Sequence, residues 1–187
     1  MTTVSDQTVG EYVQALGTMA AVPGGGSAAA LAAAMGAALL SMVAKLSARK
    51  ARAEGDRDVL TGLVSELDQL AARLLELSQD DVEAYRAVIE ARKSGSHGEA
   101  LARAYERAAE VPLATATTAA RGLALVDDIG KRAWEMTASD LAVGNELLQT
   151  GFHGALGNVG INLPDLTGEA AARIERAYRE LRALKGQ

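Results

Sequence analysis

The residues of this chain best suited to chemistry are acids and amides that interrupt apolar patterns, together with one run of glycines. Asp80 and Asp81 lie inside an apolar stripe of helical spacing that continues from Leu60 to Ile89. A carboxylate held in a cleft is desolvated, which raises its pKa and suits it to general acid–base catalysis. Two solvated acids at a helix break are the alternative, so the pattern alone leaves the role of this pair open.

A second group of polar residues occurs late in the chain. Asp140 follows Ser139 in the first turn of a predicted helix, where a negative charge stabilises the helix dipole, and that structural role suffices to explain it. Asn158 and Asn162 lie in a Gly- and Asn-rich segment that we expect to form a loop against the core. Their amides either satisfy the loop backbone or offer paired donors and acceptors to a heterocycle.

Three consecutive glycines, Gly24 to Gly26, precede Ser27 and a long apolar run. Glycine fits where the backbone takes unusual angles or where another group lies against bare main chain. Ser27 is predicted to cap the following helix, whose first N–H groups attract an anion. The alternatives are a tight turn between two core helices and a ligand-binding turn.

The elements that must position these residues are all helical, since no segment shows a strand pattern. A capping box at Thr8 and Glu11 begins the first helix. Apolar periodicity predicts a kink near Ser78, a loop at 93–98 and a break at Val111-Pro112. The predicted helices cover about residues 9–16, 27–52, 56–92, 99–111, 112–129 and 139–156, and a last one follows a connection at 157–166.

Composition favours one domain over residues 1–187, folded as an all-α antiparallel bundle of about six to eight helices. The net charge of −5 argues against nucleic-acid binding. The absence of cysteine and the presence of only two histidines argue against a metal site. No signal peptide is visible, and we expect the apolar run 28–44 to be a core helix of a cytoplasmic protein without a membrane partner. That run is apolar on all sides, so the bundle or a partner subunit should enclose it.

Several segments together resemble the cyclodeaminase/cyclohydrolase family, which includes formiminotetrahydrofolate cyclodeaminase and bacterial methenyltetrahydrofolate cyclohydrolases. The glycine-rich segment 23–44 resembles the signature of that family, and Leu-Ser-Gln-Asp-Asp-Val-Glu-Ala-Tyr at 77–85 is similar to its acidic motif. Further matches follow in the same order: Val-Pro-Leu at 111–113, Ser-Asp at 139–140 and Gly-Ala-Leu-Gly-Asn-Val-Gly-Ile-Asn at 154–162. The resemblance covers nearly the whole chain.

The resemblance implies an all-α homodimer that acts on one-carbon units of tetrahydrofolate without a metal or a permanently bound cofactor. A cyclodeaminase closes 5-formimino-tetrahydrofolate to 5,10-methenyl-tetrahydrofolate and releases ammonia. A cyclohydrolase opens the methenyl ring with water to give 10-formyl-tetrahydrofolate. Both reactions pass through a tetrahedral carbon between N5 and N10, and both need proton transfer that a nearby carboxylate can perform.

On this interpretation Asp81 is the first candidate for the acid–base group, and Asp140 is the second. The glycine turn would approach the pterin or an anionic group, the asparagines would shape the pterin pocket, and the cations would meet the glutamate tail or simply end a helix in solvent. The candidate substrate-binding residues are Gly24, Gly25, Gly26, Ser27, Lys45, Arg49, Lys50, Asn158 and Asn162.

One segment departs from the family pattern. Residues 130–138 stand where the family carries a short Gly-Asn-x-Asn turn, and they are longer and lack asparagine. If this turn shapes the pocket, we expect a different folate derivative or a modified activity. If the chain stands alone, as we expect, without a fused formiminotransferase domain, the cyclohydrolase reaction is favoured slightly. The alternative from another class is a non-catalytic folate-binding or helical interaction module that retains the fold.

Overall fold

The computed structural model describes residues 3–94 and 98–184, and within these ranges the secondary structure is helical without strands. Residues 95–97 of the predicted loop lie outside the described part. Three short 3-10 helices, at Val4–Asp6, Glu135–Thr137 and Leu163–Asp165, join or precede the longer elements. The α-helices are α1 (Val9–Leu16), α2 (Gly25–Lys50), α3 (Glu54–Lys93), α4 (Glu99–Leu123), α5 (Val126–Gly130), α6 (Ala138–Asn162) and α7 (Gly168–Leu184). The predicted all-α class is confirmed.

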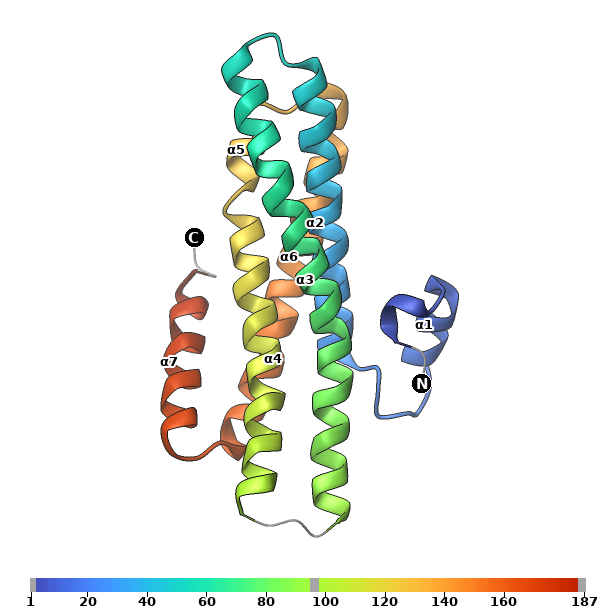
Figure 1. Ribbon diagram of the computed structural model, residues 1–187, viewed down its shortest axis with the longest axis vertical. Helices are drawn as coiled ribbons and strands as arrows, with labels where there is room; N and C mark the ends of the chain where they lie inside the picture. The colour runs from blue at the N-terminus through green and yellow to red at the C-terminus, as the bar shows by residue number, and fades with distance from the viewer. Residues whose placement is uncertain (1–2, 95–97, 185–187) are drawn as a thin grey trace.

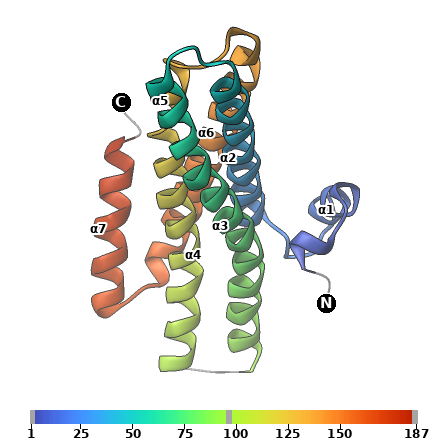
Figure 2. The ribbon, with the colours of Figure 1, turned by 45° about the horizontal axis from the view of Figure 1, so that its top comes forward.

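Four long helices form the body of the molecule (Figure 1). α2 packs against α3 and α6, and α4 packs against the same two helices, so that neighbouring helices run antiparallel. α7 lies on the outside against α4 and α6. α1 projects from the side of the bundle close to the start of α2 (Figure 2).

The alanine-rich, aromatic-poor composition is explained by the close approach of α2 and α6. A Cβ added at Gly151 would lie 2.5 Å from the Cβ of Ala33, and one added at Gly36 would lie 2.7 Å from the Gly144 carbonyl oxygen. Side chains larger than these would force the two backbones apart and open voids in the core.

Helix α6 is longer than the sequence suggests. The predicted helix end near Leu156 and the loop at 157–166 were wrong, because α6 continues to Asn162. Val159 is fully buried, and a Cβ added at Gly160 would lie 3.0 Å from the Tyr178 hydroxyl oxygen of α7. Gly160, which looks like a helix breaker, therefore allows α7 to pack closely against α6. Asn158 and Asn162 consequently lie on a helix rather than in a loop.

Helix α4 is continuous through Pro112, so the predicted break at Val111-Pro112 was also wrong. Both residues are buried, and the apolar contacts they make offset the backbone hydrogen bond that proline cannot form. Helix α3 likewise stays helical through Ser78, where we expected a kink. Ser78 is fully buried and bonds to α2, as described below.

Helix α2 is the one helix in the described ranges that is long and apolar enough to cross a membrane, judged by length and composition. Most of its apolar stretch is buried within the bundle. The enclosure is nevertheless incomplete, because Met35, Ala38 and Met42 remain exposed on one side of the helix. We refer to these three residues as the outer face of α2.

Candidate active site

A cavity of about 200 Å³ lies where the start of α2 meets α3, α4 and α6. It gathers six of the eleven predicted site residues (Gly24, Gly25, Gly26, Asp81, Asn158 and Asn162), although they are separated by up to 138 positions between Gly24 and Asn162. Its lining consists of Ala21, Val22, Gly24, Gly25, Gly26, Asp81, Ala84, Tyr85, Ala108, Asn158, Ile161 and Asn162.

The carboxylate of Asp81 lies directly on Gly26. A Cβ on residue 26 would lie 2.1 Å from Asp81 Oδ1 and 2.6 Å from its Cγ, closer than nonbonded atoms approach. Gly24 is the N-cap of α2, and Gly25, Gly26 and Ser27 form its first turn. The glycine run is therefore required because a side chain at position 26 would occupy the place of the carboxylate.

The environment of Asp81 favours its protonated form. Burial raises the pKa of this carboxyl group, and a hydrogen bond donated by the backbone N–H of Ser27 opposes that rise in part. A carboxyl group with a raised pKa beside a cavity is a candidate for proton exchange with a bound molecule. The Ser27 N–H also keeps the carboxylate in one place at the positive end of α2.

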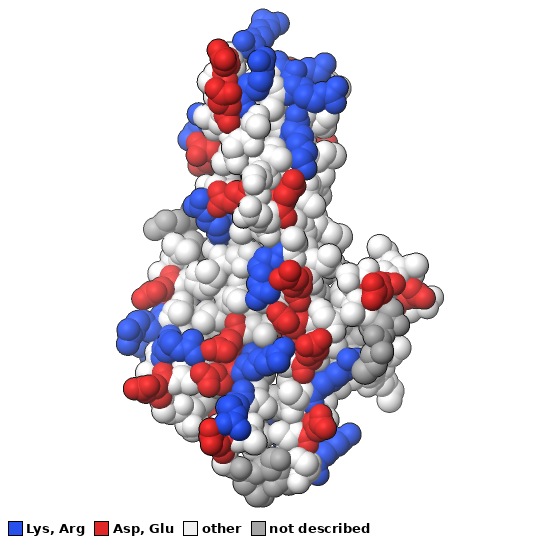
Figure 3. Space-filling view, in the orientation of Figure 1, with Lys and Arg blue, Asp and Glu red and all other residues white. Residues whose placement is uncertain are grey.

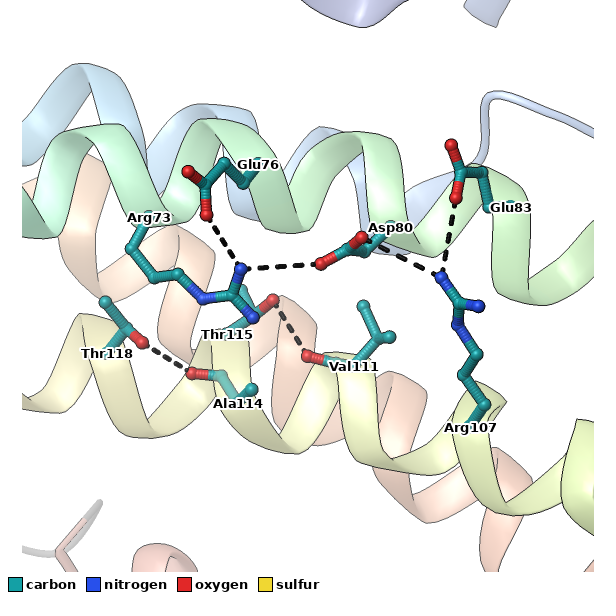
Figure 4. A network of polar contacts seen from close by, with 9 residues as sticks. All are labelled: Arg73, Glu76, Asp80, Glu83, Arg107, Val111, Ala114, Thr115 and Thr118. Atoms are coloured by element: carbon teal, nitrogen blue, oxygen red, sulfur yellow. Dashed lines mark hydrogen bonds and ion pairs between the residues drawn. The ribbon is translucent and has the colours of Figure 1, made fainter.

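The neighbouring acid, Asp80, belongs to a different structure. Its carboxylate lies in an ion network between α3 and α4, 3.6 Å from Arg73 and 3.9 Å from Arg107 (Figure 4). Two glutamates of α3 pair with the same arginines. The structure thus separates the two adjacent acids: Asp80 joins two helices at the surface, and Asp81 lines the cavity.

Asn158 and Asn162 lie one turn apart on α6 and both line the cavity. The side-chain N–H of Asn158 donates to the Gly154 carbonyl at 2.8 Å. The side-chain N–H groups of Asn162 donate to the carbonyls of Ala108 at 2.9 Å and Asn158 at 3.0 Å. Neither amide oxygen receives a hydrogen bond from the described residues, so each can accept one from a ligand.

Sequence reasoning missed two apolar walls of this cavity, Tyr85 and Ile161. Tyr85 is 47% exposed and Ile161 is 76% exposed, although both are large apolar residues. Tyr85 lies four residues after Asp81 on α3, so helical spacing alone could have placed it beside the carboxylate. A half-exposed aromatic ring at a cavity offers a flat surface on which a heterocycle can stack.

Ser27 was predicted to cap α2 and to contact the substrate, and the structure corrects the first of these expectations. Gly24 is the cap, and the Ser27 side chain is fully buried behind the cavity wall. Its hydroxyl lies 2.9 Å from Tyr12 Oη and 2.8 Å from Ser78 Oγ, and Ser78 Oγ donates to the Ser27 carbonyl at 3.0 Å. Only the backbone N–H of Ser27 takes part in the site, through Asp81.

The donor in each of these bonds follows from counting protons, since each hydroxyl carries one. Ser78 gives its proton to a carbonyl, which can only accept. Ser27 must then donate to Ser78, and Tyr12 must donate to Ser27. This hydroxyl chain of Tyr12, Ser27 and Ser78 therefore connects α1, α2 and α3 directly behind Asp81.

The structure does not bring the remaining predicted site residues to this cavity. Asp140 lies in the first turn of α6, about 27 Å along the helix from Asn158. Lys45 lies about 30 Å along α2 from Gly25, and pairs with Asp68 at 3.0 Å.

The other two predicted cations, Arg49 and Lys50, lie farther still along α2, in its last turn. The Lys50 ammonium group lies 5.0 Å from the centre of the Trp134 ring, and Arg49 is exposed. These cations belong to the end of the bundle that Figure 3 shows densely covered with Lys and Arg.

The unusual segment 130–138 also lies at this far end of the bundle. The Trp134 backbone N–H donates to Ser47 Oγ at 2.9 Å, which fastens the segment to the last turns of α2. None of its residues lines the cavity around Asp81. Its departure from the family pattern therefore does not alter the lining of this cavity.

The cavity suits an organic ligand with both donors and acceptors. It offers one carboxyl group, two amide oxygens and an aromatic ring within a mostly small-residue lining. In residues 3–94 and 98–184, no cluster of three or more acidic or histidine side chains forms a candidate metal site.

Comparison with known proteins gives this geometry a context. A family model described as Formiminotransferase-cyclodeaminase matches residues 8–180. The chain is 35% identical over 173 residues to formimidoyltransferase-cyclodeaminase of Sus scrofa, covering 85% of this chain and 31% of that protein. The chain therefore spans less than a third of the length of that relative.

Two further relatives match over most of their length. The chain is 30% identical to methenyltetrahydrofolate cyclohydrolase of Methylorubrum extorquens, covering 96% of this chain and 89% of that protein. The solved structure of formiminotetrahydrofolate cyclodeaminase from Thermotoga maritima superposes with a TM-score of 0.88 at 25% identity, covering 96% of this chain and 90% of that one.

Proposed function

Because the chain belongs to the formiminotransferase-cyclodeaminase family, we propose that it catalyses a one-carbon reaction of tetrahydrofolate in the cavity around Asp81. The observation that carries this proposal is the Asp81 carboxyl group, which lies on Gly26 with its pKa raised, at the edge of a cavity lined by Asn158, Asn162 and Tyr85. The named relatives are cyclodeaminases and a cyclohydrolase, and both chemistries need one group that accepts and returns a proton.

In the cyclohydrolase reaction, Asp81 in its ionised form accepts a proton from water as the water oxygen bonds to the methenyl carbon. The product of this step is a tetrahedral carbon that carries a hydroxyl group between N5 and N10. The bond from this carbon to N5 then breaks, N5 takes a proton, and the hydroxyl loses its proton to become the formyl carbonyl. One proton is released overall, and Asp81 can carry it between oxygen and nitrogen.

In the cyclodeaminase reaction, N10 bonds to the formimino carbon and loses its proton, while the C=N double bond becomes a single bond and the imine nitrogen takes up a proton. The tetrahedral carbon then carries an amino group, which leaves as ammonia after it is protonated. Asp81 in its protonated form is suited to give that proton, because it lies at the cavity and burial raises the pKa of its carboxyl group. The substrate carries the one-carbon unit itself, so neither scheme assigns a step to a bound cofactor or metal.

The remaining cavity residues would bind rather than react. The amide oxygens of Asn158 and Asn162 accept hydrogen bonds from N–H groups of the pterin, and Tyr85 lies against its ring. A cavity of about 200 Å³ accommodates part of a folate, so the glutamate tail would extend into solvent. Lys45, Arg49 and Lys50 lie too far along α2 to meet that tail within one subunit.

We also propose that the chain forms a homodimer through the outer face of α2. Met35 is 51% exposed and Met42 is 38% exposed, on a helix whose other sides are buried. An apolar stripe of small and flexible side chains can pack against its own copy about a two-fold axis.

The test of the proposed function uses two adjacent acids. Purified protein is mixed with 5,10-methenyl-tetrahydrofolate, and loss of its near-ultraviolet absorbance is followed. The experiment is repeated with 5-formimino-tetrahydrofolate and detection of ammonia. Asp81→Asn should lower turnover by at least about a hundredfold, the usual worth of a general acid–base group.

Asp80→Asn is the matched control, because it removes the neighbouring charge from the ion network and leaves the cavity lining intact. Its turnover should stay within about threefold of the wild type. Turnover with only one substrate identifies the reaction. Binding of both folates without any turnover would show that the protein is a folate-binding module and not an enzyme. Near-normal turnover by Asp81→Asn would assign the proton transfer to another group.

A further inference from the structure

Pro112 lies inside α4 and leaves one backbone carbonyl of that helix without its usual donor. Any other residue at position 112 would donate its N–H to the carbonyl of Ala108, four residues earlier, but proline has no N–H. In the structure, the side chain of Asn162 donates to this same carbonyl at 2.9 Å. A hydrogen bond missing within α4 is thus replaced by one from α6.

This bond determines which end of the Asn162 amide faces the cavity. Its second N–H donates to the Asn158 carbonyl at 3.0 Å, so both of its protons are used. Reversing the amide would place Oδ1 against two carbonyl oxygens and lose two hydrogen bonds. Asn162 therefore presents its oxygen, which is an acceptor, to the cavity.

We propose that Pro112 is a positioning residue, which frees the Ala108 carbonyl to orient Asn162 so that the cavity selects a ligand carrying an N–H donor. The inference rests on the proposed function for its ligand, because the reduced pterin of tetrahydrofolate carries ring N–H and amino donors. Ala108 and Asn162 both line the cavity, so the bond between them lies within contact distance of that ligand.

The direct test is Pro112→Ala. The new backbone N–H of residue 112 donates to the Ala108 carbonyl and competes there with the hydrogen bond from the Asn162 side chain. The KM for the folate substrate should rise about three- to tenfold with kcat nearly unchanged, as expected for one hydrogen bond lost in binding. The midpoint of thermal unfolding should be at or above that of the wild type, because alanine is the better helix former.

A weaker binding of substrate without a loss of stability indicates a positioning role for Pro112. If Pro112 had only a structural role, substrate affinity and the unfolding midpoint would fall together. Thr117→Ala is the matched control: it also improves the helix propensity of α4, but Thr117 is exposed and bonds only to the Leu113 carbonyl, away from the cavity. Its KM should equal that of the wild type. A double variant, Pro112→Ala with Asn162→Ala, should raise KM no more than Asn162→Ala alone, because Pro112 acts through Asn162.

A measurement without substrate distinguishes failure of this inference from failure of the proposed function. In NMR spectra of the ligand-free protein, the two side-chain amide protons of Asn162 should exchange slowly with solvent, and Pro112→Ala should speed the exchange of at least one. If the Asn162 amide protons exchange with solvent at the same rate in Pro112→Ala as in the wild type, the inference is wrong, regardless of which substrate the protein acts on. An additive rise of KM in the double variant overturns it as well.

Discussion

At the scale of single residues, the site depends on one carboxyl group held in an unfavourable environment. Asp81 is partly buried among small residues, and the Ser27 N–H only partly compensates for the lost water. Gly26 makes this position possible, since any side chain there would displace the carboxylate. A group kept in this state for chemistry should lower the stability of the folded protein when it ionises.

We therefore expect Asp81→Asn to be more stable than the wild type at pH 8. The pKa of Asp81 is raised in the folded state, so the folded protein binds its proton more tightly than the unfolded chain does. The stability this contributes is complete below the unfolded pKa and is lost as pH rises through the folded pKa. Asparagine does not ionise and can still accept the Ser27 N–H bond.

The measurement is the midpoint of thermal unfolding of both proteins at pH 4, 6 and 8. The advantage of Asp81→Asn should be largest at pH 8 and should shrink toward pH 4. Asp80→Asn serves as the comparison, because Asp80 pairs with arginines and its loss should not stabilise the protein at any of these pH values. If the difference in unfolding midpoint between Asp81→Asn and the wild type did not change with pH, ionised Asp81 would not be the cause of the lost stability.

At the scale of elements, α1 is joined to the site by the hydroxyl chain of Tyr12, Ser27 and Ser78. Helix α1 projects from the bundle, yet Tyr12 is only 5% exposed and reaches Ser27 in the first turn of α2 (Figure 1). Ser78 closes the chain onto the Ser27 carbonyl. The turn that carries the Asp81 hydrogen bond is thus held from both sides.

Tyr12→Phe tests this connection because it removes one hydroxyl and keeps the ring. It should lower the free energy of unfolding by about 1 kcal/mol, the typical worth of one hydrogen bond whose partner keeps another. Urea unfolding followed by circular dichroism measures this. Tyr178→Phe is the control, since the Tyr178 hydroxyl has no hydrogen-bond partner in the described part of the chain, and its effect should stay within about 0.5 kcal/mol. Equal effects of the two changes would show that the hydroxyl chain contributes nothing.

At the scale of the whole molecule, the bundle buries most of α2 but leaves its outer face uncovered. The proposed homodimer accounts for this face. Its centre, Ala38, lies between two methionines, so a charge placed there would be buried unpaired in the dimer.

Ala38→Arg should therefore convert the dimer to a monomer at micromolar concentration, as measured by light scattering coupled to gel filtration. Val59→Arg is the control, because Val59 is an exposed apolar residue of α3 that is not part of the outer face of α2, and its variant should keep the mass of the wild type. If the wild-type protein were itself a monomer at this concentration, the proposed homodimer would be wrong.

The sequence by itself determined the helical class, the presence of a buried α2 and the residues of the site that stand out locally. Asp81 is visible because it interrupts the apolar pattern of a helix, whereas Gly24 to Gly26, Asn158 and Asn162 stand out as glycines and amides next to apolar residues. Helix ends were less predictable: glycine in α6 and proline in α4 normally stop a helix, but packing against neighbouring helices outweighed their local cost.

Only the tertiary structure decided which polar residues meet. A helix rises about 1.5 Å per residue, so cations late in α2 and Asp140 early in α6 lie far from the cavity even though their helices contribute to it. The two adjacent acids diverge because successive residues on a helix point about 100° apart, so that Asp80 lies near Arg73 of α3 and Arg107 of α4, and Asp81 lies on Gly26. The bond from Asn162 to the carbonyl that Pro112 frees joins residues 54 positions apart, and no local pattern encodes that pairing.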